Sequence, residues 1–290
     1  MSTHVAELHS YPIKGCGSLS HESVSVTERG LAYDREWLLV DHRGSFISQR
    51  RYPELAVVQP AISDSELTAT IPSFGSVSVA LESSHSTGQA EQSVEFFNKA
   101  GTGRTQSAEA NSFFSDYLGI QVSLLRTEQP RPVNEKYRRY GAAASLGFAD
   151  GFPMLLTSKA SLAKLNSNLE APVGIDRFRA NIVIDGDSLE PYAEDRWRTL
   201  TIGNLRAYIV RACARCAVPD VDQQTGQRDS DRSVTKALRA TRHGIDRYSS
   251  TRGDFFGQNL VHVYQPASQL ALGQLVTVSL RSSKPNIRLP

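Results

Sequence analysis

The sequence contains little cysteine and no long apolar run. Its three cysteines in 290 residues are Cys16, Cys213 and Cys216. An odd count this small makes a disulfide framework implausible and favours a reducing compartment. No stretch approaches the roughly 20 apolar residues that span a bilayer, and the residues after Met1 show neither the basic nor the apolar segment of a secretory signal. We therefore expect a cytoplasmic protein with no membrane partner.

The sequence also lacks an excess of one charge. The 32 Lys and Arg residues nearly balance the 30 Asp and Glu residues, which leaves a net charge of +2 at pH 7. Because basic and acidic residues are interspersed, we expect no nucleic-acid partner. Hydrophobic residues make up 40% of the chain and charged residues 21%, as in globular proteins. The length suffices for one large or two ordinary domains.

Short apolar or alternating runs separated by Gly-, Asp- and Pro-rich turns dominate the first part of the chain. We expect strands at 5–12, 23–26, 36–41, 45–47, 55–60, 67–71, 77–81 and 120–126. Strands this short and regularly spaced predict a small barrel or sandwich. The polar residues 83–92 are expected to form an exposed loop. A helix is predicted over 107–118, where Phe113, Phe114 and Tyr117 share one face and Gly119 follows as a stop.

Residues 128–149 show no clear periodicity, and we interpret them as a linker. After them we expect a strand at 154–157, a helix at 159–169, and strands at 182–184, 200–202, 205–212, 260–264 and 275–280. The segment 255–259 is interpreted either as a turn that enters the next strand or as a glycine-containing approach to a ligand. The pattern predicts an α+β fold that is predominantly β, with domains at 1–127 and 150–283 that share an interface.

Cys213 and Cys216 lie at the end of the apolar run 205–212 and are the first candidates for chemistry. A single C-x-x-C motif is a weak signal for zinc, because no second motif is present and the seven histidines are scattered. A thioredoxin-like motif would open a helix, which Pro219 disfavours. Two interpretations stay open. The thiols are either small half-buried apolar residues, or Arg211 and Arg215 stabilise a thiolate that binds a metal or attacks a substrate.

Basic residues near strand ends are the second set of candidates. Lys14 precedes a glycine in a loop that can bring backbone N–H groups and an ammonium to a phosphate. Arg35, Arg50 and Arg179 also lie near turns. Each one alone is better interpreted as a solvated or salt-bridged surface residue. Together, arginines in such places suit bidentate recognition of a phosphate.

Nine motifs in one order make nearly the whole chain resemble the MOSC-domain family, in particular its amidoxime-reducing members. They lie at 11–14, 34–37, 49–55, 155–162, 178–184, 192–197, 213–216, 222–226 and 256–259. The resemblance implies an N-terminal β-barrel domain at 1–127, packed on a MOSC β-barrel domain with peripheral helices at 150–283.

The resemblance also implies a molybdenum cofactor, Mo-molybdopterin, held between the two domains. Its metal ligand and catalytic residue would be the second cysteine of the motif, Cys216, a soft thiolate suited to this metal. The family's cofactor-binding positions fall on Lys14, Gly15, Arg35, Asp150, Gly151, Phe152, Arg179, Asn181, Ala214, Arg215 and Asn259. At four of these, relatives carry polar side chains that this chain lacks: Gly15, Gly151, Phe152 and Ala214. At Gly15 and Ala214 a backbone N–H could substitute for the missing hydroxyl.

As a function, the resemblance implies an oxidoreductase that reduces N-hydroxylated small molecules. Because no cysteine follows Cys216, we expect electrons from a separate protein, a flavoprotein or an iron–sulfur protein. Two alternatives stay open: transfer of a persulfide sulfur by Cys216 or Cys213, and a non-catalytic protein that binds the molybdenum cofactor. Pyridoxal phosphate binding is a term attached to the family, and we assign no residue of this chain to it.

Overall fold

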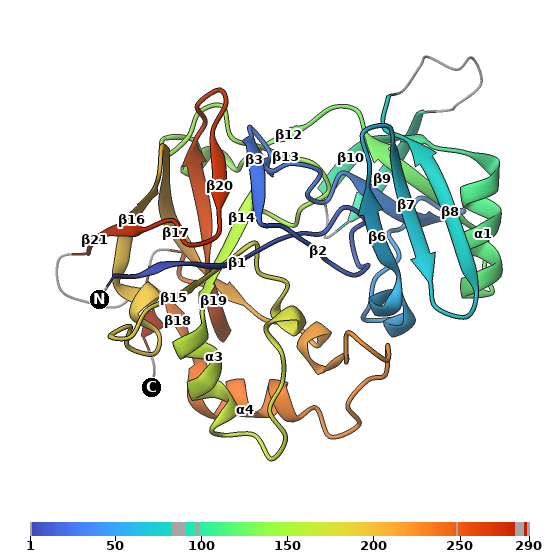
Figure 1. The fold of residues 1–290 in the computed structure, drawn as a ribbon. Coiled ribbons are helices and arrows are strands. Elements are labelled where there is room, and N and C mark those ends of the chain that lie inside the picture. The colour runs from blue at the N-terminus through green and yellow to red at the C-terminus, as the bar shows by residue number, and fades with distance from the viewer. Residues whose placement is uncertain (1, 83–90, 97–98, 248, 282–286, 289–290) are drawn as a thin grey trace.

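The structure is a computed structural model that describes residues 2–82, 91–96, 99–247, 249–281 and 287–288. Most of the regular structure is strand, and the few helices lie at the outside of the sheets (Figure 1). The prediction of a predominantly β α+β fold is therefore confirmed. No helix in the described ranges is long and apolar enough to cross a membrane.

A first lobe holds most of the first half of the chain (Figure 1, right). Its four-stranded sheet has the order β5 (Trp37–Asp41), β11 (Val122–Thr127), β10 (Lys99–Thr105) and β9 (Glu91–Phe96), and a three-stranded sheet consists of β6 (Gln59–Ile62), β7 (Glu66–Ile71) and β8 (Gly75–Ala80). Helix α1 (Ala108–Leu118) packs against β8 and β11. The Ser107 hydroxyl accepts the Ala110 N–H at 3.0 Å, and Gly119 ends the helix with φ 65°. The predicted helix at 107–118 is confirmed.

A second lobe is built around a ten-stranded sheet (Figure 1, left). Its path runs β2 (Leu19–Ser20), β1 (His4–Ser10), β15 (Ile182–Asp185), β14 (Met154–Ser158), β19 (Arg252–Val263), β17 (Leu205–Ala214), β16 (Trp197–Ile202) and β21 (Val276–Leu280), with β18 (His243–Asp246) beside β19 and β22 (Ile287–Arg288) beside β18. Only the β14–β15 pair on this path is parallel. Helices α3 (Lys159–Asn166) and α4 (Ser233–Arg242) lie on this lobe, together with 3₁₀ helices at Ile175–Phe178, Ala193–Arg196 and Val218–Asp220.

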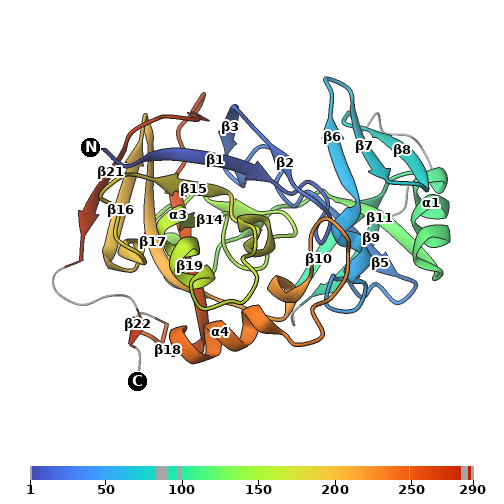
Figure 2. The ribbon, with the colours of Figure 1, turned by 60° about the horizontal axis from the view of Figure 1, so that its bottom comes forward.

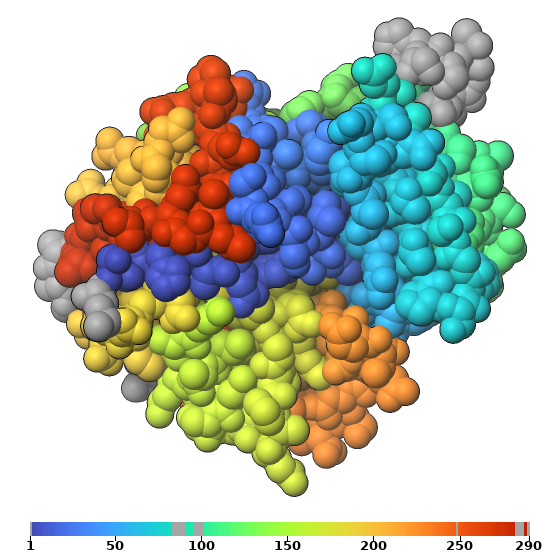
Figure 3. Space-filling view, in the orientation of Figure 1, coloured from blue at the N-terminus to red at the C-terminus, as the bar shows by residue number. Residues whose placement is uncertain are grey.

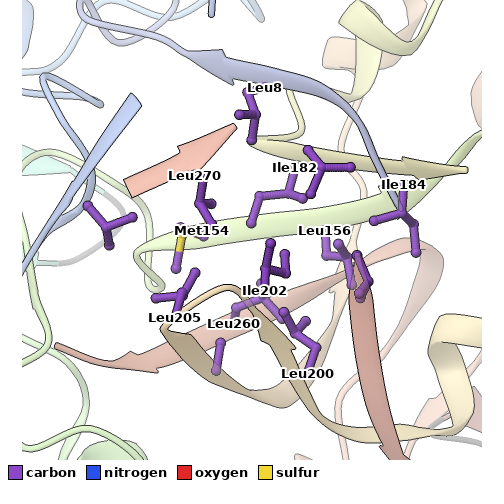
Figure 4. Packing of buried hydrophobic residues seen from close by; sticks show 14 of the residues in the cluster. Leu8, Met154, Leu156, Ile182, Ile184, Leu200, Ile202, Leu205, Leu260 and Leu270 are labelled. Carbon is purple, nitrogen blue, oxygen red and sulfur yellow. The ribbon is translucent and has the colours of Figure 1, made fainter. Parts of the chain in front are cut away.

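The first strands of the chain belong to the second lobe. Strand β1 pairs with β15, and β3 (Ser23–Thr27) lies between β4 (Gly30–Leu31) and β20 (Gln269–Ala271). Leu8 packs among Leu156, Ile182 and Leu270 in the core of this lobe (Figure 4). The blue N-terminal segments therefore lie between the two lobes on the face shown in Figure 3. The domain limits proposed from the sequence stay a prediction.

Residues 128–149 connect the lobes in a packed form. They contain β12 (Arg131–Pro132), α2 (Glu135–Arg138) and β13 (Ser145–Leu146). Val133 and Tyr137 are buried in a cluster with Val210 of β17 and Val261 of β19. These contacts attach the segment to the second lobe, and the interpretation as a linker did not predict them.

Three local predictions are corrected. Residues 45–47 make isolated bridges at Ser45 and Phe46 instead of a strand. The expected strand at 55–60 is a 3₁₀ helix, Pro53–Val57, because Pro53 suits a first helical turn where no N–H is needed, and β6 starts only at Gln59. Strand β19 is longer than 260–264, so 255–259 lies within a strand. Gly257, with φ 82°, is needed there because a Cβ would lie 2.9 Å from the Leu156 carbonyl oxygen.

Strands β9 and β10 were not predicted from the sequence. Their residues include two glycines and few alternating apolar side chains, so the period-two signal is weak. Of the expected loop at 83–92, residues 83–90 lie outside the described residues, and the last two residues begin β9.

Candidate functional site

A cavity of about 370 Å³ is lined by residues of both lobes. All of the site residues proposed from the sequence line it: Lys14, Gly15, Arg35, Asp150, Gly151, Phe152, Arg179, Asn181, Ala214, Arg215, Cys216 and Asn259. The first lobe also supplies a continuous strip, Phe46 to Arg50, and the second lobe supplies Arg211 and Cys213. The fold thus brings together residues that are widely separated in the sequence.

The two cysteines lie at the end of β17 on the wall of this cavity. Cys213 is partly buried, Cys216 is exposed, and both are free thiols. Arg215 donates a hydrogen bond to the Cys213 Sγ at 2.9 Å, whereas Arg211 donates to the Thr251 hydroxyl at 2.8 Å. The arginine contact expected from the sequence therefore exists for Cys213 and is made by Arg215.

The backbone of the cysteine motif is held by acidic residues of neighbouring segments. The Asp246 carboxylate accepts the Ala212 N–H at 2.7 Å, and the Arg215 N–H donates to the Asp254 carbonyl at 2.8 Å. The short 3₁₀ helix with Pro219 in its first turn then directs the chain away from β17. Cys16, by contrast, is fully buried in the first lobe, where burial raises its pKa to about 12.

Arg35 is fixed by three neighbouring groups. Its Nη1 donates to both carboxylate oxygens of Asp34 at 2.8 and 2.6 Å, and to the Asn181 side-chain oxygen at 3.1 Å. Its Nη2 donates to the Arg179 carbonyl at 3.1 Å. Burial acts to lower the pKa of Arg35, but the charge and hydrogen bonds of Asp34 outweigh burial and raise it. Arg35 is thus a permanent cation in a fixed orientation.

Asn181 uses its whole side chain to join segments of the protein. Its Nδ2 donates to the His9 carbonyl and to Asp34, each at 3.0 Å. Its Oδ1 accepts the Leu155 N–H at 3.0 Å and the Arg35 Nη1 at 3.1 Å. Because these four bonds saturate the amide, Asn181 positions Arg35 and the surrounding backbone.

Arg179 has no such partners. It follows the 3₁₀ helix Ile175–Phe178 in a left-handed conformation with φ 53°, and its guanidinium lies 4.2 Å from the centre of the Tyr11 ring. Its Nη1 and Nη2 are buried and make no hydrogen bond to any described residue. Burial is the main reason that its pKa is lowered to about 10, and the nearby Arg35 adds to this effect. A buried cation without acceptors is costly, and an anion in the cavity would supply them.

Lys14 is the fifth cation of the cavity wall whose contacts are defined. Its Nζ donates to the Phe148 carbonyl at 2.7 Å and forms an ion pair with Asp150. Burial lowers the pKa of Lys14, and Asp150, whose side chain is exposed, opposes this effect. The neighbouring Gly15 has φ 91°, a left-handed conformation that favours glycine over serine.

The remaining proposed positions contribute surface with few polar atoms. The Phe152 ring packs edge-on against Tyr137, with 5.0 Å between ring centres. Ala214 lies opposite Phe255 in the β17–β19 pair, and Asn259 lies opposite Arg211. Gly151 carries no side chain. Gly151, Phe152 and Ala214 can offer only backbone groups and apolar surface, whereas Asn259 also carries a side-chain amide.

Comparisons with known proteins identify the family of this chain. The model of the MOSC N-terminal beta barrel domain matches residues 2–121, and the model of the MOSC domain matches residues 143–277. The chain is also 31% identical over 233 residues to mitochondrial amidoxime-reducing component 1 of Mus musculus, which covers 78% of this chain and 67% of that protein. The chain belongs to the MOSC family.

Two further relatives show that this MOSC protein resembles proteins with two different activities. Mitochondrial amidoxime reducing component 2 of Bos taurus is 31% identical over 230 residues, covering 77% of this chain and 67% of that protein. Molybdenum cofactor sulfurase of Homo sapiens is 30% identical over 244 residues, covering 78% of this chain but 27% of that protein. The chain spans about two thirds of the first kind of relative and little more than a quarter of the second.

Sequence reasoning missed two positioning residues and one wall of the cavity. Asp34 lies next to Arg35 in the motif at 34–37, and Tyr11 begins the motif at 11–14. Membership of these motifs was the sequence signal that could have identified both residues. The strip Phe46 to Arg50 carried only one signal, the basic Arg50 near a turn. Its place in the same cavity as the cysteine motif is a property of the folded chain.

Proposed function

We propose that this protein is a molybdenum-cofactor-dependent oxidoreductase that reduces N-hydroxylated small molecules. The observation that carries the proposal is the buried guanidinium of Arg179, which lacks an acceptor among the described residues and lines the same cavity as the exposed thiol of Cys216. The anionic tail of such a cofactor would accept hydrogen bonds from Arg179, and its metal would bind the Cys216 sulfur. The amidoxime-reducing relatives, matched over two thirds of their length, support the reaction.

The chain offers a separate set of residues to each part of such a cofactor. Lys14, Arg35 and Arg179 would hold the phosphate and the pterin, and the two arginines present planar donors for an anion. Cys216 would be the protein ligand of the metal. Where Gly15 and Ala214 have no polar side chain, backbone N–H groups would make the contact.

When bound, the molybdenum centre supplies the two-electron chemistry that cleaves an N–O bond. Reduction of N–OH to N–H takes two electrons and two protons and releases water. A separate flavoprotein or iron–sulfur protein would provide the electrons. Within the cavity, the Lys14 Nζ is suited to hold a proton, because its pKa is lowered by burial and its partner Asp150 is exposed to solvent.

The test combines metal content with activity. The protein is reconstituted with molybdenum cofactor, its molybdenum is measured by elemental mass spectrometry, and reduction of benzamidoxime is followed with reduced methyl viologen as donor. We expect about one molybdenum per chain in the wild type, little in Cys216→Ser, and retention of metal in the matched variant Cys213→Ser. A metal-loaded protein that leaves benzamidoxime unchanged would contradict the proposal.

A second candidate function is sulfur transfer. The contact between Arg215 and the Cys213 Sγ at 2.9 Å favours it, because a cation beside sulfur stabilises a thiolate or persulfide anion, and the sulfurase relatives match the same part of the chain. This function requires a sulfur on Cys213 or Cys216 that cyanide releases as thiocyanate, and no tightly bound molybdenum. A third possibility, a non-catalytic cofactor carrier, requires stoichiometric pterin without turnover.

A further inference from the structure

The strip Phe46 to Arg50 forms a wall of the cavity that the proposed cofactor site does not use. It comes from the first lobe, after β5, and contributes Phe46, Ile47, Ser48, Gln49 and Arg50 to the lining. The Arg50 side chain is exposed, whereas Gln49 is buried. The cavity therefore has an outer wall with a charged end.

This wall is joined to the segment that follows Cys216. The side chains of Gln49 and Gln223 exchange hydrogen bonds at 3.2 and 3.3 Å, and Arg228 donates to the Arg50 carbonyl at 2.5 Å. Figure 2 shows this orange segment, between β17 and α4, reaching across to the first lobe. A ligand on the outer wall would therefore lie on the cysteine side of the cavity.

The chemistry of the outer wall suits an aromatic ring with an anionic group. The Phe46 ring lies near two cations, with its centre 6.0 Å from the Arg50 guanidinium carbon and 5.5 Å from the Lys14 Nζ. Val218 and Pro219, which follow Cys216, add apolar surface to the same cavity. A flat ring can pack on these apolar groups while a carboxylate reaches Arg50.

The charge of the cavity favours the same kind of ligand. The described lining residues include one carboxylate, Asp150, and six basic side chains: Lys14, Arg35, Arg50, Arg179, Arg211 and Arg215. Lys14 is paired with Asp150, and Arg35 with Asp34 outside the lining. Arg50 is exposed and is part of the lining, so a small molecule that enters from solvent can reach its guanidinium.

We propose that Phe46 and Arg50 form a substrate subsite that selects planar aromatic N-hydroxylated substrates bearing a carboxylate. The proposal rests on the proposed function and adds the class of substrate. Arg50 binds the carboxylate, and Phe46 supports the ring.

The experiment compares benzamidoxime with its para-carboxylate derivative. The cofactor-loaded protein is assayed with reduced methyl viologen, and the ratio of kcat/KM for the charged and uncharged substrates is determined. We expect the wild type to prefer the carboxylate by about fivefold, as for a partly exposed ion pair. The ratio should fall to about one in Arg50→Ala and lie between these values in Arg50→Lys, which keeps the charge but not the planar fork.

Arg51→Ala is the matched control. Arg51 is the next residue, is exposed, lies over the Tyr52 ring at 5.5 Å and is not part of the cavity lining, so this variant should keep the wild-type ratio. Raising the salt concentration should reduce the wild-type ratio, because the charge on Arg50 is screened. A wild-type ratio near one, an unchanged ratio in Arg50→Ala, or an equal loss in Arg51→Ala overturns the subsite.

A failure of the proposed function is distinguishable from a failure of the subsite. If neither substrate is reduced by metal-loaded protein, the oxidoreductase proposal fails. The subsite is then decided by isothermal titration of the para-carboxylate compound into wild type and Arg50→Ala. About fivefold weaker binding by the variant supports the subsite, and equal binding overturns it.

Discussion

Asn181 provides the most direct test of how the cavity is held together. The substitution Asn181→Ala removes four hydrogen bonds, to His9, Asp34, Leu155 and Arg35, in a fully buried position. The Leu155 N–H and the His9 carbonyl lose the partner that Asn181 supplies, at about 1–3 kcal/mol for each buried group. Asp34 and Arg35 still form their ion pair with each other, so losing the bond to Asn181 costs less for each of them, about 1 kcal/mol. We expect a destabilisation of at least about 4 kcal/mol.

The assay is urea unfolding of the cofactor-free protein, with ΔG from linear extrapolation and with attention to the slope m. Asn259→Ala is the matched control, because Asn259 lines the same cavity and its side chain makes no hydrogen bond to any described residue. It should cost less than about 1 kcal/mol. The reasoning is refuted if Asn181→Ala lies within 1 kcal/mol of wild type, or if the two variants are equally destabilised. Either result would mean that the four bonds are replaced by water or are not made.

Two further predictions concern buried charges. The Arg179 guanidinium Nη atoms have no partner in the described part of the chain, so Arg179→Met should stabilise the cofactor-free protein by about 1–3 kcal/mol. The same variant should abolish binding of inorganic phosphate measured by titration calorimetry, and lower stability would contradict the reasoning. Burial, together with the charge of Asp195, raises the pKa of Glu194 to about 7. The stability that the protonated Glu194 side chain contributes is therefore fully present below pH 4.5 and is lost as the pH rises through 7. Glu194→Gln should therefore match wild type near pH 4.5 in urea unfolding and exceed it at pH 8 by up to about 3 kcal/mol; equal stability at both pH values would contradict the shift.

Local sequence signals predicted those parts of the fold whose determinants are close together in the chain. The helix at 107–118 has its cap, its apolar face and its terminating glycine within thirteen residues, and it forms as predicted. The strand expected at 55–60 failed because apolar composition does not distinguish a strand from a 3₁₀ helix, whereas Pro53 favours the latter. Strands β9 and β10 carried too little alternation to be detected and are defined by pairing with each other and with β11.

The residues of the candidate site could be chosen from motifs, but their contacts could not. The sequence placed Arg211 and Arg215 near two cysteines, and the structure shows that Arg215 contacts Cys213. It placed Asn181 among cofactor-lining residues, and the structure shows an amide saturated by the protein itself. Which partner a side chain binds depends on which groups lie near it after folding, and the hydrophobic periodicity of the sequence does not predict this.

By itself the sequence determined the predominantly β character of this protein, its membership of the MOSC family through motifs in one order, and the residue types available for an anion and a soft metal. Those properties follow from composition, from local periodicity and from motifs that are short in sequence. Tertiary structure alone decided that β1 and β3 pair with strands from the second half of the chain, that Arg179 is left without an acceptor among the described residues, and that Phe46 and Arg50 share a cavity with Cys216. These depend on strand pairing and burial between segments that are distant in the sequence and meet only when the chain folds.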